Sequence, residues 1–180
     1  MSGSAENRAL IASLIRDVVD FPQPGIVFKD ITPLLGSPTG YAAAIAELAA
    51  AAPDGVDYVV GMEARGFVFA GPVALALGAG FVPVRKPGKL PSAVYTQTYA
   101  LEYGEETLAI HADALPAGAR VMIVDDVLAT GGTIAATVDL VRRLGAEVVQ
   151  VSVLLELGFL NGRGLLASHD LADPSAVLSL

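Results

Sequence analysis

Apolar side chains near the start of the chain recur every three or four residues, which is the spacing of one face of a helix. The periodic set consists of Leu10, Ile11, Leu14, Ile15 and Val18. The next segment, FPQPGIVFKDITPLLG at 21–36, is rich in large apolar groups, but its prolines and glycines exclude a long regular element. We therefore expect an N-terminal helix followed by an ordered loop that packs against other parts of the protein.

From residue 37 onward, short apolar runs alternate with longer helical segments. Ser37 followed by Pro38 is typical of a helix start, and the alanine-rich helix that follows is predicted to end near residue 52. Strands at 58–62, 81–84, 120–124 and 148–157 are expected to alternate with helices at 67–77, where Pro72 would lie in the first turns, and from 132 to about 145. This alternation predicts an α/β fold with a mostly parallel sheet flanked by helices. The residues after 157 are expected to be short and irregular.

Between the second and third of these strands, the sequence predicts a loop and a hairpin in place of another helix. The sequence RKPGKLPSA at 85–93 holds two prolines and a glycine, which predicts a mobile loop. The residues at 94–101 and 106–111 predict two strands joined by a turn at Tyr103-Gly104. Together, residues 85–111 would form a flexible loop and flap beside the sheet.

Size and composition limit the kinds of protein that this chain can be. Its 180 residues fit one domain, 1–180, with a single core, and 53% hydrophobic against 17% charged residues excludes a disordered chain. There is no cysteine, which removes disulfides, thiolate metal sites and cysteine nucleophiles. No apolar run is long enough to cross a bilayer and no secretion signal is visible, so we expect a cytoplasmic protein with no membrane partner.

Charge narrows the choice of ligand. A formal net charge of −8 argues against nucleic acid as a partner. One short window is nevertheless basic, because Arg85, Lys86 and Lys89 lie within five residues, and such a cluster on an acidic protein favours a small anionic ligand. This cluster and the segments 61–66 and 125–133 each follow a predicted strand. They should therefore meet at the carboxyl edge of the sheet, where ligands of such folds bind.

The strongest chemical signal is VMIVDDVLATGGT at 121–133, an apolar strand that ends in two carboxylates, Asp125 and Asp126. The turn Thr130-Gly131-Gly132-Thr133 then begins a helix. Its glycines let the backbone curl, and the unpaired N–H groups of the turn and helix start suit a phosphate. The carboxylates would repel a phosphate, but they suit the neutral 2′,3′-diol of a ribose. One loop could thus hold both ends of a ribose 5-phosphate.

This stretch resembles the signature by which type I phosphoribosyltransferases bind 5-phosphoribosyl-1-pyrophosphate (PRPP). That family has an α/β fold with a small N-terminal hood and a flexible flap, which the resemblance places here at 1–36 and 85–111. The resemblance further implies that PRPP is bound by Asp125, Asp126, Ala129, Thr130, Gly131, Gly132 and Thr133.

Three other segments resemble the adenine-specific branch of the family. By that resemblance, Val27, Phe28 and Lys29 within 21–36 would line the adenine pocket. Arg65 in GMEARGF at 61–67 would bind pyrophosphate. The match is continuous from Arg85 through Glu106, and it implies that Arg85, Lys86 and Lys89 bind pyrophosphate, that Glu102 is the catalytic acid/base, and that Tyr103 belongs to the flap.

The resemblance implies transfer of the 5-phosphoribosyl group of PRPP to adenine, giving AMP and pyrophosphate, which is a reaction of purine salvage. It also implies Mg²⁺ carried mainly by PRPP or pyrophosphate, with no direct protein ligand, and a homodimer. Two alternatives remain open at this point. The chain could act on another base, such as hypoxanthine, guanine or xanthine, or it could be a regulatory protein of the same fold that senses PRPP.

Each segment also has a purely structural interpretation. A strand-to-helix turn rich in Asp, Thr and Gly can serve capping alone, Arg65 can pair with Glu63 on the surface, and Glu102 can be a solvated charge. The sequence GRGLLA at 162–167 fits a dinucleotide-binding pattern, but the rest of a βαβ unit does not follow it, so we discount it. Two histidines with no cysteine disfavour a transition-metal site.

Overall fold

The computed structural model describes residues 2–100, 104–171 and 173–180. The chain divides into two compact units, Met1–Glu47 and Leu48–Leu180. The expectation of one domain over 1–180 stays a prediction. Within the described residues, no helix has both the length and the apolar character that a membrane span needs.

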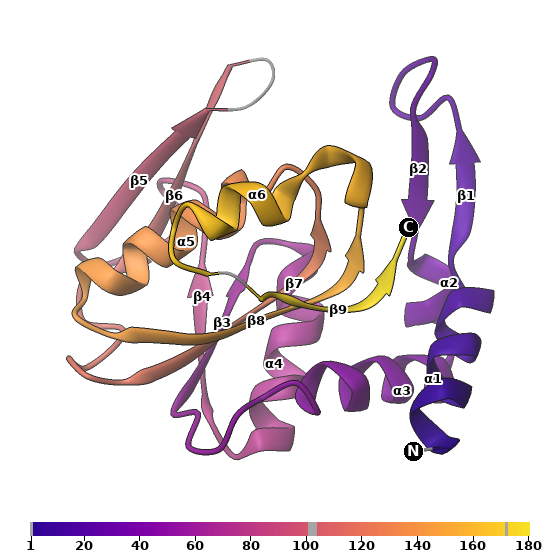
Figure 1. Cartoon of the computed structure of the whole chain (residues 1–180). Coiled ribbons are helices and arrows are strands. Elements are labelled where there is room, and N and C mark those ends of the chain that lie inside the picture. The colour runs from indigo at the N-terminus through magenta and orange to yellow at the C-terminus, as the bar shows by residue number, and fades with distance from the viewer. Residues whose placement is uncertain (1, 101–103, 172) are drawn as a thin grey trace. The chain divides into compact units, whose positions relative to one another are not determined.

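The N-terminal unit combines helices with a two-stranded antiparallel hairpin (Figure 1). Its elements are α1 (Ser2–Ser13), β1 (Arg16–Val19), β2 (Val27–Asp30), α2 (Thr32–Leu35) and α3 (Pro38–Ala49), the last of which continues into the second unit. The predicted cap of α3 is confirmed, since Ser37 Oγ accepts a hydrogen bond from Gly40 N at 3.1 Å.

The first helix is shorter than its apolar spacing predicts. It ends at Ser13, and the residues from Arg16 onward form strand β1, so the expectation of helix through Val18 is wrong. The reason is the pairing partner: β1 aligns with β2, with Val18 opposite Phe28. β-Branched residues fit a paired strand better than a frayed helix end, and the spacing within 10–18 alone gives no sign of that partner.

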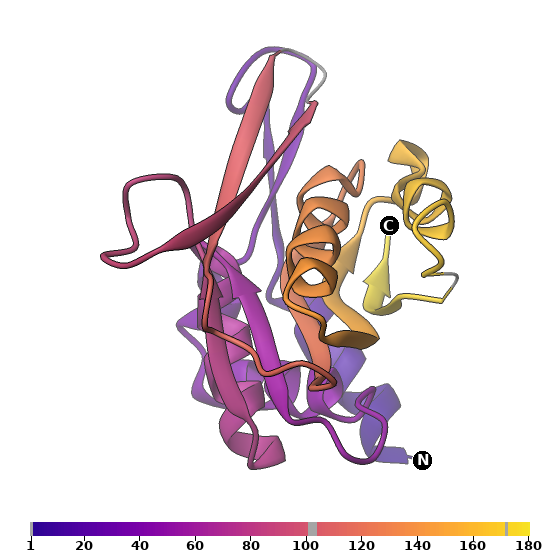
Figure 2. The same cartoon turned by 90° about the vertical axis from the view of Figure 1, so that its left-hand side faces the viewer.

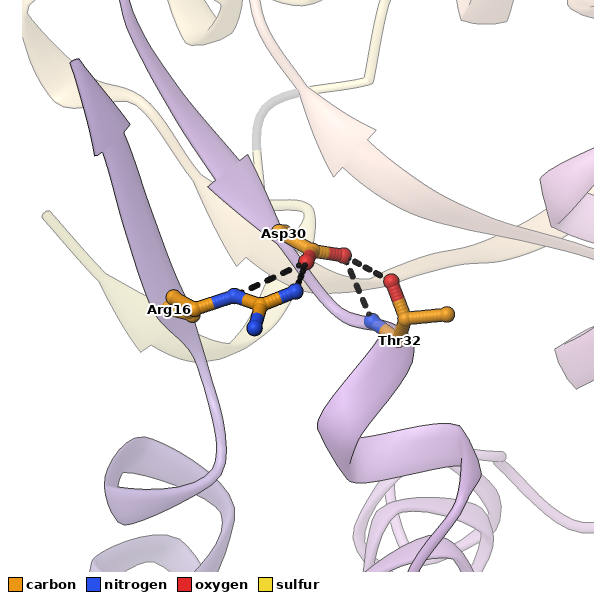
Figure 3. A network of polar contacts seen from close by, with 3 residues as sticks. All are labelled: Arg16, Asp30 and Thr32. Atoms are coloured by element: carbon orange, nitrogen blue, oxygen red, sulfur yellow. Dashed lines mark hydrogen bonds and ion pairs between the residues drawn. The ribbon is translucent and has the colours of Figure 1, made fainter.

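Polar contacts join the two strands at the open end of this hairpin, opposite its turn (Figure 3). Asp30, at the end of β2, accepts hydrogen bonds from Arg16 Nε at 3.2 Å and from the backbone N–H of Thr32 at 2.8 Å. The Thr32 hydroxyl donates to the same carboxylate. These contacts, led by the Thr32 hydroxyl, lower the pKa of Asp30 to about 2. One carboxylate therefore joins the two strands to the start of α2.

The second unit is built on a five-stranded parallel sheet in the order β4-β3-β7-β8-β9. This confirms the predicted α/β class. The sheet strands are β3 (Tyr58–Met62), β4 (Gly80–Val84), β7 (Arg120–Leu128), β8 (Glu147–Glu156) and β9 (Ser175–Ser179). Residues 59–62 of β3, 121–124 of β7 and 151–155 of β8 are buried and, apart from Ser152, carry no polar side chain, as expected for strands covered on both faces.

Helices cover both faces of this sheet, with α4 (Arg65–Leu77) on one side and α5 (Gly132–Arg143) with α6 (Gly162–Ala167) on the other (Figures 1 and 2). The chain order explains this. β3 connects through α4 to β4 on one side, whereas β7 connects through α5 to β8 on the other. Right-handed crossovers in opposite directions place their helices on opposite faces. The carboxyl ends of β3 and β7 thus flank the point where ligands of such sheets bind.

The predicted flap is an antiparallel hairpin of β5 (Val94–Ala100) and β6 (Glu105–His111). Residues 101–103, between the two strands in sequence, lie outside the described residues. A bridge between Arg85 and Ala109 joins the basic segment after β4 to the hairpin. The hairpin therefore begins beside the carboxyl edge of the sheet.

Three sequence expectations for this unit are corrected. The loop expected from Asp125 onward is still strand, because β7 pairs with β8 as far as Leu128. Pro72 lies in the middle of α4 and not in its first turns. The stretch after 157, expected to be irregular, contains α6 and the edge strand β9, whose short sequence SAVLS becomes a strand by pairing with β8.

Candidate active site

A pocket of about 320 Å³ lies at the carboxyl ends of β3 and β7. It brings together predicted site residues from three segments that are distant in sequence. Those that line it are Arg65, Lys86, Asp125, Asp126, Ala129 and Thr133. A larger hollow of about 510 Å³ lies at the amino ends of the strands, but none of the residues that line it is cationic, so it does not suit a phosphate.

A smaller cavity of about 50 Å³ is enclosed by the turn of 129–134 itself. Gly131 precedes α5 with φ 88°, a left-handed conformation that suits glycine. The first intrahelical bond runs from Ala135 N to Gly131 O, so the N–H groups just before it have no acceptor within the helix. The turn thus has the size and the donors of an anion cradle.

The start of α6 supports this turn from behind. A Cβ atom on Gly162 would lie 2.4 Å from the carbonyl oxygen of Ala129, and one on Gly131 would lie 2.9 Å from the carbonyl oxygen of Gly162. Neither residue can carry a side chain without displacing backbone. Gly162, the first glycine of GRGLLA, therefore packs against the candidate phosphate turn of residues 129–134.

The paired carboxylates are buried side chains of β7. Asp125 is 8% and Asp126 5% exposed. A Cβ atom on Gly66 would lie 2.6 Å from Asp125 Oδ1, so the start of α4 approaches this carboxylate closely. Burial, followed by the charge of Asp126, raises the pKa of Asp125 well above its usual value. Burial also raises the pKa of Asp126, against the opposing charge of Arg65.

Three of the predicted pyrophosphate-binding cations have a carboxylate partner. Arg65 Nε lies 2.7 Å from Asp126 Oδ2, Arg85 Nε 2.7 Å from Glu63 Oε2, and Lys86 Nζ 2.7 Å from Glu106 Oε1. Arg85 also donates to the Lys89 carbonyl at 3.1 Å, which folds the basic segment back on itself. Neither Arg85 nor Lys89 is among the residues that line the pocket. An anion at this end would compete with the carboxylates for these cations, which keep further N–H donors of their own.

The pocket residues that sequence reasoning missed include Tyr99 and Glu106, which face each other across the hairpin. Tyr99 Oη lies 3.0 Å from Glu106 Oε2 and 3.0 Å from Thr133 Oγ1. The hairpin prediction contained a usable signal. A turn at 103–104 places residue 99 near residue 106 on the same face.

The residues predicted to bind adenine and to form the tip of the flap do not line this pocket in the part of the chain that the structure describes. Val27, Phe28 and Lys29 form the start of β2 in the N-terminal unit. The Phe28 ring makes an edge contact with Phe21 at 5.2 Å between centroids, and Lys29 Nζ lies 2.7 Å from Asp17 Oδ1. Glu102 and Tyr103 fall outside the described residues.

Comparisons with known proteins decide what this site belongs to. The phosphoribosyl transferase domain family matches residues 34–167. An adenine phosphoribosyltransferase of Cutibacterium acnes is 64% identical over 95% of this chain and 97% of its own length. The chain belongs to the adenine phosphoribosyltransferase family. The crystal structure of the adenine phosphoribosyltransferase from Rhodothermus marinus shares its fold, with a TM-score of 0.90 and 48% identity over 98% of this chain and 99% of that one.

Membership of the adenine phosphoribosyltransferase family confirms the predicted fold and enzyme class, and it favours adenine among the bases that the sequence left open. A solved relative from Saccharomyces cerevisiae, 39% identical with a TM-score of 0.88 over 97% of this chain and 99% of that one, is complexed with adenine and an imino-altritol bisphosphate. That family member therefore holds a base and a doubly phosphorylated ligand together.

Proposed function

We propose that this enzyme transfers the 5-phosphoribosyl group of PRPP to adenine, with release of AMP and pyrophosphate, in the pocket at the carboxyl ends of β3 and β7. The observation that carries the proposal is the lining of that one pocket. It combines a candidate phosphate turn, two buried carboxylates and two cations from separate segments. PRPP offers the complementary groups, namely a 5-phosphate, a diol and a pyrophosphate.

At the ribose end, the turn of 129–133 would hold the 5-phosphate through its backbone N–H groups and the hydroxyls of Thr130 and Thr133. Asp125 and Asp126 would accept hydrogen bonds from the 2′- and 3′-hydroxyls. Asp126 Oδ2 is buried and lies 2.7 Å from Arg65 Nε, so the same carboxylate would link the diol end of the site to a proposed pyrophosphate ligand.

At the other end, Arg65, Arg85, Lys86 and Lys89 would bind the pyrophosphate. A guanidinium donates two parallel hydrogen bonds to phosphate oxygens, whereas an ammonium acts as a movable point charge. Part of this set could serve the site of a second subunit, since Arg85 and Lys89 do not line this pocket. We propose a homodimer, which is supported by exposed apolar side chains of α4 and β4: Val68, Leu75 and Phe81.

For the base, we propose that Val27, Phe28 and Lys29 line the adenine pocket, with backbone groups of Val27 and Lys29 reading the ring edge and Phe28 stacking on the ring. Glu102 is proposed as the general acid/base that handles the proton on N9 of adenine. A Glu102→Gln variant should lose most of kcat, and normal turnover by that variant would refute the role.

The mechanism follows from the charge that develops during transfer. As pyrophosphate leaves, C1′ of the ribose becomes positive and the leaving group gains negative charge. Arg65 and the basic segment would stabilise the leaving group, and the diol and 5-phosphate contacts would fix C1′ relative to the base. The β5–β6 flap would exclude water, which would otherwise hydrolyse PRPP.

Mg²⁺ is proposed as a partner of the substrate. We propose that the ion is carried by pyrophosphate and ribose oxygens, because Mg²⁺ keeps several waters and rarely needs a cage of protein ligands. When bound, it supplies charge neutralisation for the leaving group. Asp125 and Asp126 would orient its water ligands. The cytoplasmic location stays a prediction.

The test is an Asp125→Asn/Asp126→Asn double variant, which keeps side-chain shape and removes both charges. We expect the KM for PRPP to rise by about tenfold or more, because charge-assisted hydrogen bonds to the diol are lost. Asp139→Asn, a carboxylate that pairs with His169, is the control and should leave the KM unchanged. Unaltered PRPP binding by the double variant would refute the assignment of the diol site.

A further inference from the structure

Four side chains, from β5, β6, α5 and the basic segment after β4, form one continuous polar chain at the pocket. Lys86 Nζ lies 2.7 Å from Glu106 Oε1, Tyr99 Oη lies 3.0 Å from Glu106 Oε2, and Thr133 Oγ1 lies 3.0 Å from Tyr99 Oη. One end of the chain is a proposed pyrophosphate ligand and the other is a hydroxyl of the proposed phosphate turn. Tyr99 and Glu106, which we call the bridge, connect them.

The direction of each hydrogen bond follows from the number of hydrogens available. Lys86 and Tyr99 lower the pKa of Glu106, so its ionised carboxylate only accepts. The single phenolic hydrogen of Tyr99 therefore goes to Glu106, and Thr133 has to donate its own hydroxyl hydrogen to Tyr99. Both the Lys86 ammonium and the Thr133 hydroxyl hydrogen are thus engaged by the bridge.

We propose that Tyr99 and Glu106 are positioning residues that couple the two phosphate-binding ends of the site, so that an anion at one end weakens binding of an anion at the other. This inference rests on the proposed function of the pocket. Neither residue needs to touch the reacting atoms.

The coupling arises because hydrogen bonds in a chain polarise one another. A pyrophosphate that takes Lys86 removes a charged donor from Glu106. The carboxylate then draws more strongly on the Tyr99 hydrogen, and the Tyr99 oxygen becomes a better acceptor that retains the Thr133 hydrogen. In the reverse direction, a 5-phosphate that takes the Thr133 hydrogen makes Tyr99 a poorer donor, so Glu106 holds Lys86 more firmly.

This antagonism suits the order of events in the reaction. PRPP occupies both ends as one molecule. Once the bond at C1′ is broken, the two phosphate groups belong to different products. Repulsion transmitted through the bridge would then favour departure of pyrophosphate while the nucleotide 5-phosphate is still bound.

The test compares pyrophosphate binding with and without ribose 5-phosphate. The Kd of pyrophosphate, with Mg²⁺ present, is measured by calorimetry on the full chain, alone and with saturating ribose 5-phosphate, and the ratio of the two values is the coupling. Direct repulsion between the two anions contributes equally in wild type and variant. Tyr99→Phe should therefore reduce the ratio by the bridge contribution alone, about fivefold.

Tyr99→Phe retains the aromatic ring, whose Cδ2 would lie 2.9 Å from a Cβ on Gly132, so the packing of the ring against the phosphate turn is kept. Two further variants, Tyr95→Phe and Glu106→Gln, complete the comparison. Tyr95→Phe removes a hydroxyl on the same face of β5, where the Tyr95 ring contacts the Arg143 guanidinium at 4.4 Å, and it should keep the wild-type ratio. Glu106→Gln should lower the ratio and also tighten pyrophosphate binding by the otherwise unliganded protein.

The outcomes separate the bridge from the pocket assignment. The bridge would be overturned if Tyr99→Phe had the wild-type ratio of pyrophosphate Kd values. The pocket assignment would survive that result as long as pyrophosphate and ribose 5-phosphate still compete with PRPP. Failure of both ligands to compete with PRPP would overturn the proposed site and the bridge with it. The reciprocal titration, ribose 5-phosphate with and without pyrophosphate, has to give the same factor by thermodynamic linkage.

Discussion

At the scale of single residues, the site is defined by cations that are already paired. The sequence identifies Arg65, Arg85 and Lys86 as candidate anion ligands, but it does not give their partners. Glu63, two positions from Arg65, instead pairs with Arg85, 22 residues away. Such pairings depend on how β3 and β4 align in the sheet, which no local pattern encodes.

The Arg85–Glu63 pair makes a first prediction. Glu63→Gln should strengthen product inhibition by pyrophosphate by about threefold to tenfold, because the anion no longer competes with a carboxylate for Arg85. The inhibition constant is measured at saturating adenine. Asp113→Asn, a carboxylate in the loop after β6, should leave it unchanged. A Glu63→Gln enzyme that is inhibited less strongly would contradict the expectation.

Asp30 makes a second prediction, on the N-terminal unit. Its pKa is lowered to about 2, so its charge stabilises the folded state above the unfolded pKa of about 3.9, and this stabilisation disappears as the pH falls through 2. The difference in free energy of unfolding between wild type and Asp30→Asn should be constant above pH 5 and vanish near pH 2. Urea unfolding at several pH values measures it, and a difference independent of pH would refute the role of the charge.

At the scale of elements, alternation of apolar runs predicts the type and order of the strands at 58–62, 81–84, 120–124 and 148–157. It fails where pairing overrides local pattern. β7 continues through two aspartates because β8 supplies its hydrogen bonds, and β9 forms from five residues only because the edge of β8 is free to pair with it. The support of the phosphate turn by α6 was equally invisible in sequence.

That support makes a third prediction. Gly162→Ala places a Cβ 2.4 Å from the Ala129 carbonyl oxygen, so the phosphate turn has to shift. We expect the KM for PRPP to rise about tenfold, with a smaller change in kcat. Gly164→Ala on the same helix is the matched control, since the three atoms nearest to its new methyl group all belong to the Asn161 side chain, which can move. Equal kinetics for the two variants would show that the contact is unimportant.

At the scale of the whole molecule, the order of strands and helices along the chain determines where the pocket lies. Opposite crossovers from β3 and β7 leave their carboxyl ends side by side, and the sequence motifs that follow these strands meet there. The position of the site was therefore predictable from the order of strands and helices. The roles of individual residues were predictable only through family resemblance, because a turn that caps a helix and a turn that binds phosphate have similar sequences.

The proposed homodimer makes a fourth prediction. Leu75 is 84% exposed and belongs to the exposed apolar side chains of α4 and β4 on which the proposed interface rests. Leu75→Glu should shift the protein from dimer to monomer in sedimentation velocity at micromolar concentration, because a charge would be buried in the interface. Phe159→Glu, which alters another exposed apolar residue, should leave the dimer intact. A monomeric wild type would refute the proposal directly.

The most direct test of the central claim is a base panel. The purified chain is incubated with PRPP and Mg²⁺, and adenine, hypoxanthine, guanine, xanthine, orotate and uracil are offered one at a time while nucleotide and pyrophosphate are quantified. We predict AMP and pyrophosphate in equal amounts from adenine alone, and loss of both in the Asp125→Asn/Asp126→Asn variant at low PRPP. Turnover of another base in preference to adenine, or full activity of that variant, would contradict the account.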